Sequence, residues 1–260
     1  MRHRLKLVIT VVILSLLVVG SSFYLPIAFA GVTNHQLASI CLFISNTGGT
    51  HGVPIITLLF CFIIGFQFKG WRKKTTSISI SLILFSLILG GFAQLNEHFI
   101  KEQLKIPRPN ILFLESNYEF NQTAFYHYNN KSERRHYLES FLSEESNHPI
   151  SYNNNQISTA VLDHWLYETG YSFPSGHSFN AFLMATLMGY ILLFVYTDFR
   201  RKLLFLLPFV WAISIAYSRT VLGVHSAIDI SIGALMGSCI GLTIASTGLI
   251  DKLAKQKIKL

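Results

Sequence analysis

Long apolar runs separated by short polar connections make up most of this chain. Six of the runs approach the length of about 20 residues that a helix needs to cross roughly 30 Å of hydrocarbon. They lie near 7 to 29, 53 to 68, 76 to 95, 178 to 197, 203 to 218 and 226 to 249. The pattern predicts an all-α integral membrane protein with six transmembrane helices in a single domain over 1 to 260.

A polar segment from about 96 to 174 interrupts the apolar pattern and is rich in Asn, Ser, Glu and Tyr. It predicts a water-facing cap between the third and fourth spans. Within the cap, Ser132 is a candidate N-cap for a helix from Glu133 to Ser143, and a second short helix is expected from Ile157 to Tyr167. A further apolar stretch from Leu37 to Ile44 predicts a helix at the membrane interface.

Basic residues mark every second connection between the spans. Fourteen of the 21 lie in four groups: Arg2, Arg4 and Lys6; Lys69, Arg72, Lys73 and Lys74; Arg200, Arg201 and Lys202; and Lys252, Lys255, Lys257 and Lys259. Because cytoplasmic loops carry the excess of Lys and Arg, both termini are expected in the cytoplasm and the cap on the outer face. A cleavable signal peptide ending near Ala28-Phe29-Ala30 is the alternative for the N-terminus. The apolar run continues past Gly20, which favours a retained helix.

The composition excludes two broad classes of protein. A hydrophobic content of 51% with only 13% charged residues and a mean hydropathy of +0.43 is too apolar for a soluble domain of this length. The net charge of +8 is spread over several clusters and does not form the continuous patch that nucleic acid requires. Cys41, Cys61 and Cys239 lack disulfide or zinc spacing and are interpreted as packing residues.

The first candidate site cluster runs from Lys101 to Pro109, just beyond the third span. Lys101 and Arg108 are seven positions apart, which would place both cations on nearly one side of a helix, and Pro107 and Pro109 stiffen its end. A basic pair beside lipid headgroups would give the same pattern. Taken alone, this cluster therefore favours the interfacial interpretation.

The second cluster, from Phe173 to His177, directly precedes the fourth span. Ser175 and Gly176 would leave backbone N–H groups free at a helix N-terminus, where the helix dipole favours phosphate. His177 would lie beside that anion. An ordinary helix cap with an incidental histidine is the alternative.

The third cluster, from Ser218 to Asp229, connects the fifth and sixth spans. His225 and Asp229 are four positions apart at the start of a helix, so they share a face and the carboxylate can accept a hydrogen bond from the imidazole. An ionised Asp in a span costs several kcal/mol unless it is paired, and Arg219 lies in the same connection. The cluster therefore favours function over a structural His–Asp pair.

The predicted topology places all three clusters on one face of the membrane. Three cations, two histidines, a carboxylate and a helix N-terminus can then converge. Such a set predicts a site that binds a phosphoryl group and transfers it to and from an imidazole.

The three clusters together resemble the signature of the type 2 phosphatidic acid phosphatase (PAP2) family. Their order and their placement relative to the six spans also match that family. The run from His164 to Gly170 is similar, within the family, to the bacterial phosphatidylglycerophosphatase B and undecaprenyl-diphosphate phosphatase group.

The resemblance implies hydrolysis of a lipid phosphate through a phosphohistidine. His225 would be the nucleophile, Asp229 would orient its ring, and His177 would act as general acid and base. The implied phosphate ligands are Lys101, Arg108, Ser175, Gly176 and Arg219, with Glu168 as a possible accessory residue. The resemblance implies no metal and no cofactor. The implied partners are a lipid phosphate and the bilayer of a bacterial inner membrane, with no nucleic acid and no obligatory protein partner.

Two alternative functions use the same residues. A lipid-phosphate binder or transporter would need the cations but not the pair of His225 and Asp229, and a phosphotransferase would pass the phosphoryl group to an acceptor other than water. A vanadate-dependent haloperoxidase uses a related phosphate pocket, but a six-span membrane chain is the wrong setting for such an enzyme. Phosphatidylglycerophosphate, phosphatidic acid, diacylglycerol pyrophosphate and undecaprenyl diphosphate all remain open as substrates.

The other histidines of the polar segment are expected to be solvated or capping residues: His98, His127, His136, His148 and His164.

Overall fold

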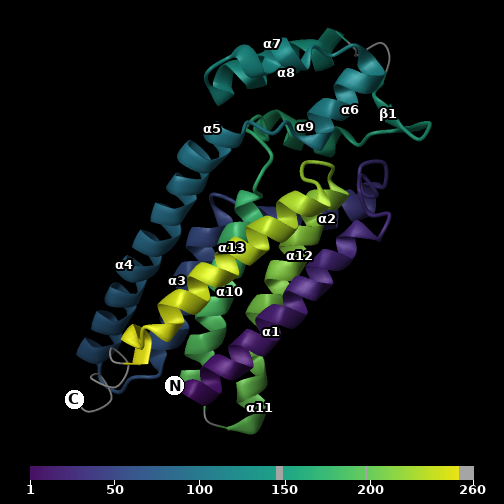
Figure 1. Ribbon diagram of the computed structural model, residues 1–260. Coiled ribbons are helices and arrows are strands. Elements are labelled where there is room, and N and C mark those ends of the chain that lie inside the picture. Colours follow the sequence, from purple (N-terminus) through teal and green to yellow (C-terminus); the bar gives the residue numbers. More distant parts are fainter. Residues whose placement is uncertain (145–148, 197, 252–260) are drawn as a thin grey trace.

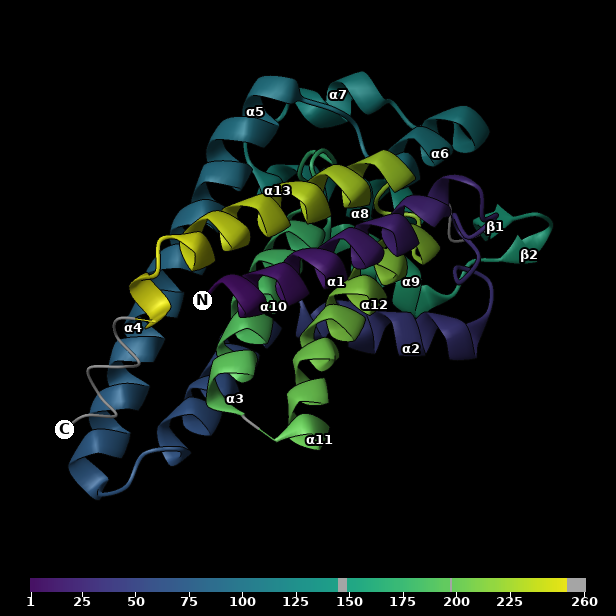
Figure 2. The same cartoon turned by 60° about the horizontal axis from the view of Figure 1, so that its bottom comes forward.

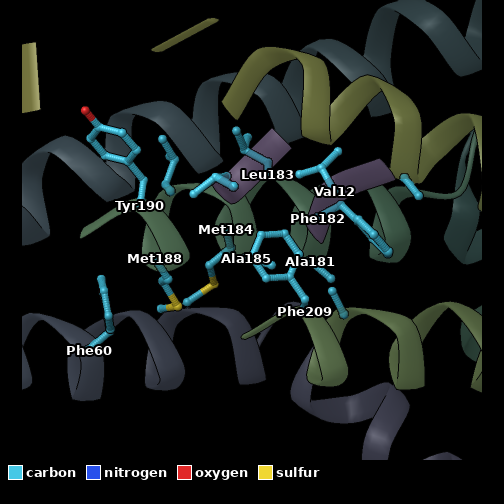
Figure 3. Close-up of a cluster of buried hydrophobic side chains, with 14 of the residues drawn as sticks. Val12, Phe60, Ala181, Phe182, Leu183, Met184, Ala185, Met188, Tyr190 and Phe209 are labelled. Carbon is cyan, nitrogen blue, oxygen red and sulfur yellow. The ribbon is translucent and has the colours of Figure 1, made fainter. Parts of the chain in front are cut away.

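Helix α10 (Gly176–Val195) lies at the centre of a bundle of long helices in the computed structural model, which describes residues 1–144, 149–196 and 198–251 (Figure 1). Its sequence is apolar on all faces, and such a helix is stable only when it is surrounded. The helices around it are α1 (Arg2–Gly20, extended by the 3₁₀ turn η1, Ser21–Phe23), α3 (Gly52–Phe66), α4 (Trp71–Leu95), α12 (Leu207–Val221) and α13 (Ala227–Ser246). Phe60, Phe209 and Val12 pack against it from three of these helices (Figure 3).

A row of glycines on α13 allows close contact with α10. A Cβ at Gly237 would lie 2.2 Å from the carbonyl oxygen of Phe179, and one at Gly233 would lie 2.5 Å from that of Ser175. Small residues spaced by four let membrane helices approach until their backbones touch. This packing fixes the first turns of α10 and α13 side by side.

Five helical segments are long and apolar enough to span a membrane, and a sixth span requires the bent pair of α2 (His35–Thr47) and α3, whose axes differ by 61°. The predicted all-helical membrane class is confirmed.

The boundaries of several helices differ from the predicted ones. The helix expected around 37 to 44 is α2. The first helix ends near Gly20 rather than residue 29, in a turn before Pro26, whose ring cannot continue a helix. The fifth begins earlier than residue 203.

The fifth span begins early because Asp198 caps the helix that precedes it. The Asp198 side chain accepts a hydrogen bond from the Arg201 N–H at 3.3 Å, so the chain turns helical directly after it. Helix α11 (Phe199–Lys202) and the 3₁₀ turn η4 (Leu203–Leu206) then lead into α12.

The third span continues beyond its predicted end. After α4, the π-helical turn η2 (Asn96–Ile100) and α5 (Lys101–Leu104) extend the helix, which stops at Lys105 in a left-handed conformation with φ of 48°. The prediction that Lys101 and Arg108 share one helix is therefore wrong. Arg108 instead forms the N-cap position of the next helix, ahead of Pro109.

The polar segment forms a cap over one end of the bundle (Figure 1). Its elements are α6 (Pro109–Tyr118), α7 (Gln122–His127), α8 (Lys131–Glu144), β1 (Ser151–Tyr152), β2 (Asn155–Gln156) and α9 (Thr159–Tyr167). The small antiparallel hairpin was not predicted; it turns at Asn153 and Asn154, both with positive φ. Asn130, not Ser132, caps α8, because its side chain accepts from the Glu133 N–H at 2.8 Å.

Aromatic side chains attach the cap to the bundle. The ring of Phe29, in the loop after α1, stacks on Tyr152 at 5.3 Å and meets Trp165 edge-on at 6.3 Å. The Trp165 indole N–H donates to the carbonyl of Leu222, directly after α12, at 2.9 Å. The cap is therefore fixed directly above the loop that carries the third sequence cluster.

The end of the bundle opposite the cap contains the start of α1, the α3–α4 connection and α11 (Figures 1 and 2). These segments carry the first three basic groups identified in the sequence. Arg4 pairs there with Asp251, which ties the start of α1 to the chain after α13. The fourth basic group, Lys252 to Lys259, and His148 lie outside the described residues.

Candidate active site

The N-terminus of α10 is held against the first turn of α13. The Ser175 N–H donates to the carbonyl of Asp229 at 3.0 Å, while the Ser175 hydroxyl accepts from the Ser178 N–H at 3.4 Å. Ser175 is fully buried. These bonds leave the first turn of α10, with Gly176 and His177, at the cap end of the bundle.

His225 and Asp229 lie together at the start of α13. Their closest atoms, Nδ1 and Oδ2, are 3.6 Å apart. Ser172, which sequence reasoning missed, lies between them, with its Oγ 3.2 Å from Nδ1 and 2.5 Å from Oδ2. Asp229 also completes a capping box, since its Oδ2 accepts from the Ser226 N–H at 2.7 Å. Two donors therefore hold the carboxylate: the Ser226 N–H at the start of its own helix and the Ser172 hydroxyl in the neighbouring loop.

This arrangement selects one tautomer of His225. If Ser172 donates to Asp229, its oxygen can accept only from an N–H at Nδ1 of the ring. The other nitrogen, Nε2, then keeps its lone pair and lies 3.1 Å from Nη1 of Arg108. Burial, followed by the positive charge of Arg108, lowers the pKa of His225 to about 3, so the ring is neutral at physiological pH.

Arg108 and Arg219 meet at one carboxylate. Nη2 of Arg108 lies 2.8 Å from Oε2 of Glu168, and Arg219 pairs with the other oxygen of the same group. Burial alone would raise the pKa of Glu168, but Arg219 and Arg108 hold it well below its ordinary range. Glu168 is therefore an anion that fixes two otherwise separate guanidinium groups.

Backbone and side-chain acceptors complete the fixation of both arginines. Arg108 donates from Nε to the Gly170 carbonyl at 2.9 Å and from Nη1 to the Val224 carbonyl at 3.1 Å. Arg219 is fully buried and donates from Nη1 to Ser45 Oγ at 2.5 Å. The guanidinium planes consequently keep one orientation before any ligand binds.

His164 is part of this cluster, so the prediction that it is a solvated or capping residue is wrong. Its Nε2 lies 3.1 Å from Nη1 of Arg219. Burial and then the charge of Arg219 lower the pKa of His164 to about 4. The run from His164 to Gly170 carried a signal for this contact, because His164 lies four positions before Glu168 at the end of a predicted helix.

Lys101 approaches the same site from α5. Its side chain is buried, and Nζ lies 2.9 Å from Oε2 of Glu97. A Cβ added to Gly176 would lie 4.0 Å from that nitrogen, so the ammonium group lies close to the first turn of α10. Lys101 and Arg108 thus converge although they belong to different helices.

A cavity of about 550 Å³ opens next to these groups. The predicted site residues that line it are Lys101, Arg108, Glu168, Gly176, His177 and His225. Ser175, Arg219 and Asp229 lie buried behind them. The cavity continues along α3 and α4, where Thr57, Ser86 and Ala93 form part of its wall.

The cysteines were interpreted as packing residues. Cys61 is buried in the bundle as expected, whereas Cys239 is exposed on α13.

Comparison with known proteins identifies the family. Residues 79–249 match the PAP2 superfamily, and all nine predicted site residues lie inside this range. The chain belongs to the PAP2 superfamily. The family predicted from the three sequence clusters is thereby confirmed.

Relatives within the PAP2 superfamily are similar over most of this chain. Phosphatidylglycerophosphatase B of Escherichia coli strain K12 is 29% identical over 166 residues, which are 64% of this chain and 59% of that protein. The protein of the same name from Haemophilus influenzae is 28% identical over 197 residues, 74% of each chain. The crystal structure of a transmembrane PAP2 type phosphatidylglycerolphosphate phosphatase from Bacillus subtilis aligns with a TM-score of 0.51, at 18% identity, over 93% of this chain and 94% of that one. This structural match supports the fold.

Proposed function

We propose that this PAP2 superfamily member is a membrane lipid phosphatase that hydrolyses a phosphomonoester or diphosphate lipid. The observation that carries the proposal is the position of His225 Nε2, 3.1 Å from the Arg108 guanidinium at the wall of a cavity that also contains His177 and Lys101. A nucleophile beside fixed cations is what phosphoryl transfer requires. The names of the two bacterial relatives agree with this activity.

The proposed reaction has two steps. Nε2 of His225 attacks phosphorus, and the bond between phosphorus and the leaving oxygen breaks while His177 gives that oxygen a proton. Water then attacks the phosphohistidine, His177 accepts a proton from the water, and the phosphorus–nitrogen bond breaks to release orthophosphate and neutral His225. Asp229 and Ser172 stabilise the positive ring that exists while nitrogen is bonded to phosphorus.

Lys101, Arg108 and Arg219 are the proposed ligands of the phosphate oxygens, together with the N-terminus of α10 at Ser175 and Gly176. Guanidinium groups bind phosphate oxygens in pairs, and a helix N-terminus supplies free N–H donors. Glu168 is proposed to hold the two arginines in place until phosphate arrives. In the described part of the chain no three His, Cys, Asp or Glu side chains gather as a metal site, and metal independence remains a prediction.

The shape of the cavity supports a lipid as the substrate. Its wall runs from the charged residues down the apolar surfaces of α3 and α4. A phosphate could therefore reach His225 while its acyl or prenyl chains stay in hydrocarbon. We place the site on the outer face of a bacterial inner membrane and the N-terminus in the cytoplasm, because the basic segments lie at the end of the bundle opposite the cap.

Phosphate release by the purified protein in detergent tests the proposal. The substrates are phosphatidylglycerophosphate, phosphatidic acid, diacylglycerol pyrophosphate and undecaprenyl diphosphate, each with excess chelator, and His225→Ala is the control. We expect release that survives chelation and disappears in the variant, together with an acid-labile phosphoryl label on the wild-type protein. A labelled protein that loses its label only when a lipid acceptor is added, with the phosphoryl group recovered on that acceptor, would indicate phosphotransfer. A folded wild-type protein that neither releases phosphate nor becomes labelled would indicate a binder or transporter.

A further inference from the structure

Lys131 reaches the same cavity from the cap, and neither the sequence clusters nor the proposed reaction uses it. It is the first residue of α8, and its side chain lines the cavity together with Lys101, Glu97 and Glu168. Its ammonium group pairs with Oε1 of Glu97, while the other oxygen of that carboxylate binds Lys101 at 2.9 Å. One carboxylate therefore separates a buried lysine of the proposed site from a half-exposed lysine of the cap.

Several features hold Lys131 in this position. The Thr169 hydroxyl donates to the Lys131 carbonyl at 3.1 Å, which attaches the start of α8 to the loop that carries Glu168 and Gly170. A Cβ on Gly170 would lie 3.1 Å from Cε of Lys131 and 3.2 Å from Oε1 of Glu97, so the absence of a side chain there leaves room for the pair. A lysine in the first turn of a helix is unfavourable for the helix dipole. Its placement therefore points to a role outside α8.

The lysines and arginines around the cavity outnumber the carboxylates that pair with them. Glu97 is shared by Lys101 and Lys131, and Glu168 is shared by Arg108 and Arg219. Lys131 therefore holds only half of a shared carboxylate. Because 53% of its side chain is exposed, it can turn toward a ligand at a small desolvation cost.

We propose that Lys131, positioned by Glu97, binds the non-reacting phosphate group of a lipid that carries two phosphate groups. The inference rests on the proposed function, since it assigns the reacting phosphate to Lys101, Arg108, Arg219 and His225. The second group is a phosphodiester or the inner phosphate of a diphosphate. It then lies beside Lys131, on the cap side of Glu97. The site selects two-phosphate lipids over a simple phosphomonoester such as phosphatidic acid.

Lys131→Gln tests the assignment. Loss of one charge-assisted hydrogen bond should lower kcat/KM about tenfold or more for diacylglycerol pyrophosphate and phosphatidylglycerophosphate, relative to its effect on phosphatidic acid. Lys131→Arg should keep the wild-type ratio. Lys105→Gln is the matched control: it removes an exposed cation at the end of α5 that is not part of the cavity wall, so the ratio should not move. Equal losses for both lipid classes in Lys131→Gln would overturn the proposal.

A binding measurement separates this inference from the proposed function. Thermal unfolding in detergent with inorganic pyrophosphate or orthophosphate reports which anion the site binds more tightly. We expect pyrophosphate to stabilise the wild type more than orthophosphate does, and Lys131→Gln to remove the difference. If no lipid is hydrolysed but this difference is seen, the proposed function fails and the subsite stands. If the lipids are hydrolysed and both anions act alike in wild type and variant, the subsite fails.

Discussion

Ser172 places its hydroxyl against His225, with Oγ 3.2 Å from the ring Nδ1. The same oxygen lies 2.5 Å from Asp229 Oδ2, whereas the direct distance from ring to carboxylate is 3.6 Å. A buried hydroxyl between a histidine and an aspartate can accept from one and donate to the other. Ser172 is thus a positioning residue that links Asp229 to the proposed nucleophile.

Ser172→Ala should lower kcat about tenfold and leave KM nearly unchanged, because a hydrogen bond that involves an ionised partner contributes about 1.5 to 3 kcal/mol. The measurement is steady-state kinetics on a lipid phosphate across pH. Ser172→Thr, which keeps the hydroxyl, should recover part of the rate if it folds. Wild-type kcat in Ser172→Ala would show that the direct contact between His225 and Asp229 suffices.

Sequence reasoning found the elements whose signals are local and missed those that depend on tertiary contacts. Hydropathy predicted the membrane helices, and spacing predicted that His225 and Asp229 lie close together, although His225 precedes Ser226, the N-cap of α13, and is not part of the helix. Ser172 was missed because its partners lie 53 and 57 positions further along the chain. The prediction that Lys101 and Arg108 share one helix was wrong because Lys105 adopts a left-handed conformation that no local sequence pattern indicates.

Arg108, a proposed phosphate ligand, also lowers the pKa of His225. Burial and then the charge of Arg108 lower the histidine pKa to about 3, so the ring is neutral and can act as a nucleophile near physiological pH. Arg108→Gln removes the repulsion and should raise the pKa toward its ordinary value of 6.5. The protonated, inactive fraction then grows at acid pH, and the acid limb of kcat/KM should move up by about one pH unit.

The pH profile of the Arg108 variants checks this prediction. Arg108→Lys retains a cation and should keep the acid limb near its wild-type position, even though its overall rate falls. If Arg108→Gln and Arg108→Lys lose activity equally and share the wild-type limb, the guanidinium acts on phosphate alone.

Glu168 stabilises two buried arginines in the absence of substrate. Glu168→Gln should lower the unfolding temperature, since loss of one partner of a buried ion pair costs about 3 to 5 kcal/mol. Orthophosphate should then stabilise the variant more than it stabilises the wild type, because the freed guanidinium groups gain a new anion. Thermal unfolding with and without orthophosphate checks both effects, with exposed Glu139→Gln as the control. Unchanged unfolding and unchanged turnover on every lipid would remove Glu168 from the site.

Close packing of α10 and α13 positions His177 relative to His225. Gly237→Ala would place a methyl group 2.2 Å from the Phe179 carbonyl, which forces the two backbones apart and should destabilise the protein by about 1 to 3 kcal/mol. Gly91→Ala, on α4 with no atom within 4 Å of the added carbon, should be neutral or slightly stabilising. Unfolding temperature in detergent distinguishes the two, and equal values for both would show that the helices can separate without cost.

The proposed entry route between α3 and α4 makes a prediction about substrate size. Ser86 lines the cavity, whereas its neighbour Leu87 faces away and is 68% exposed. Ser86→Trp should block the path of a lipid chain and lower kcat/KM for long-chain lipid phosphates about tenfold or more, while a soluble short-chain phosphate still reaches His225 from the cap side. Leu87→Trp adds the same ring to an exposed side of the helix outside the cavity wall and should leave both activities intact. Equal inhibition of both substrates by Ser86→Trp would mean that the ring disturbs the charged end of the cavity, and the chain would then have to enter by another path.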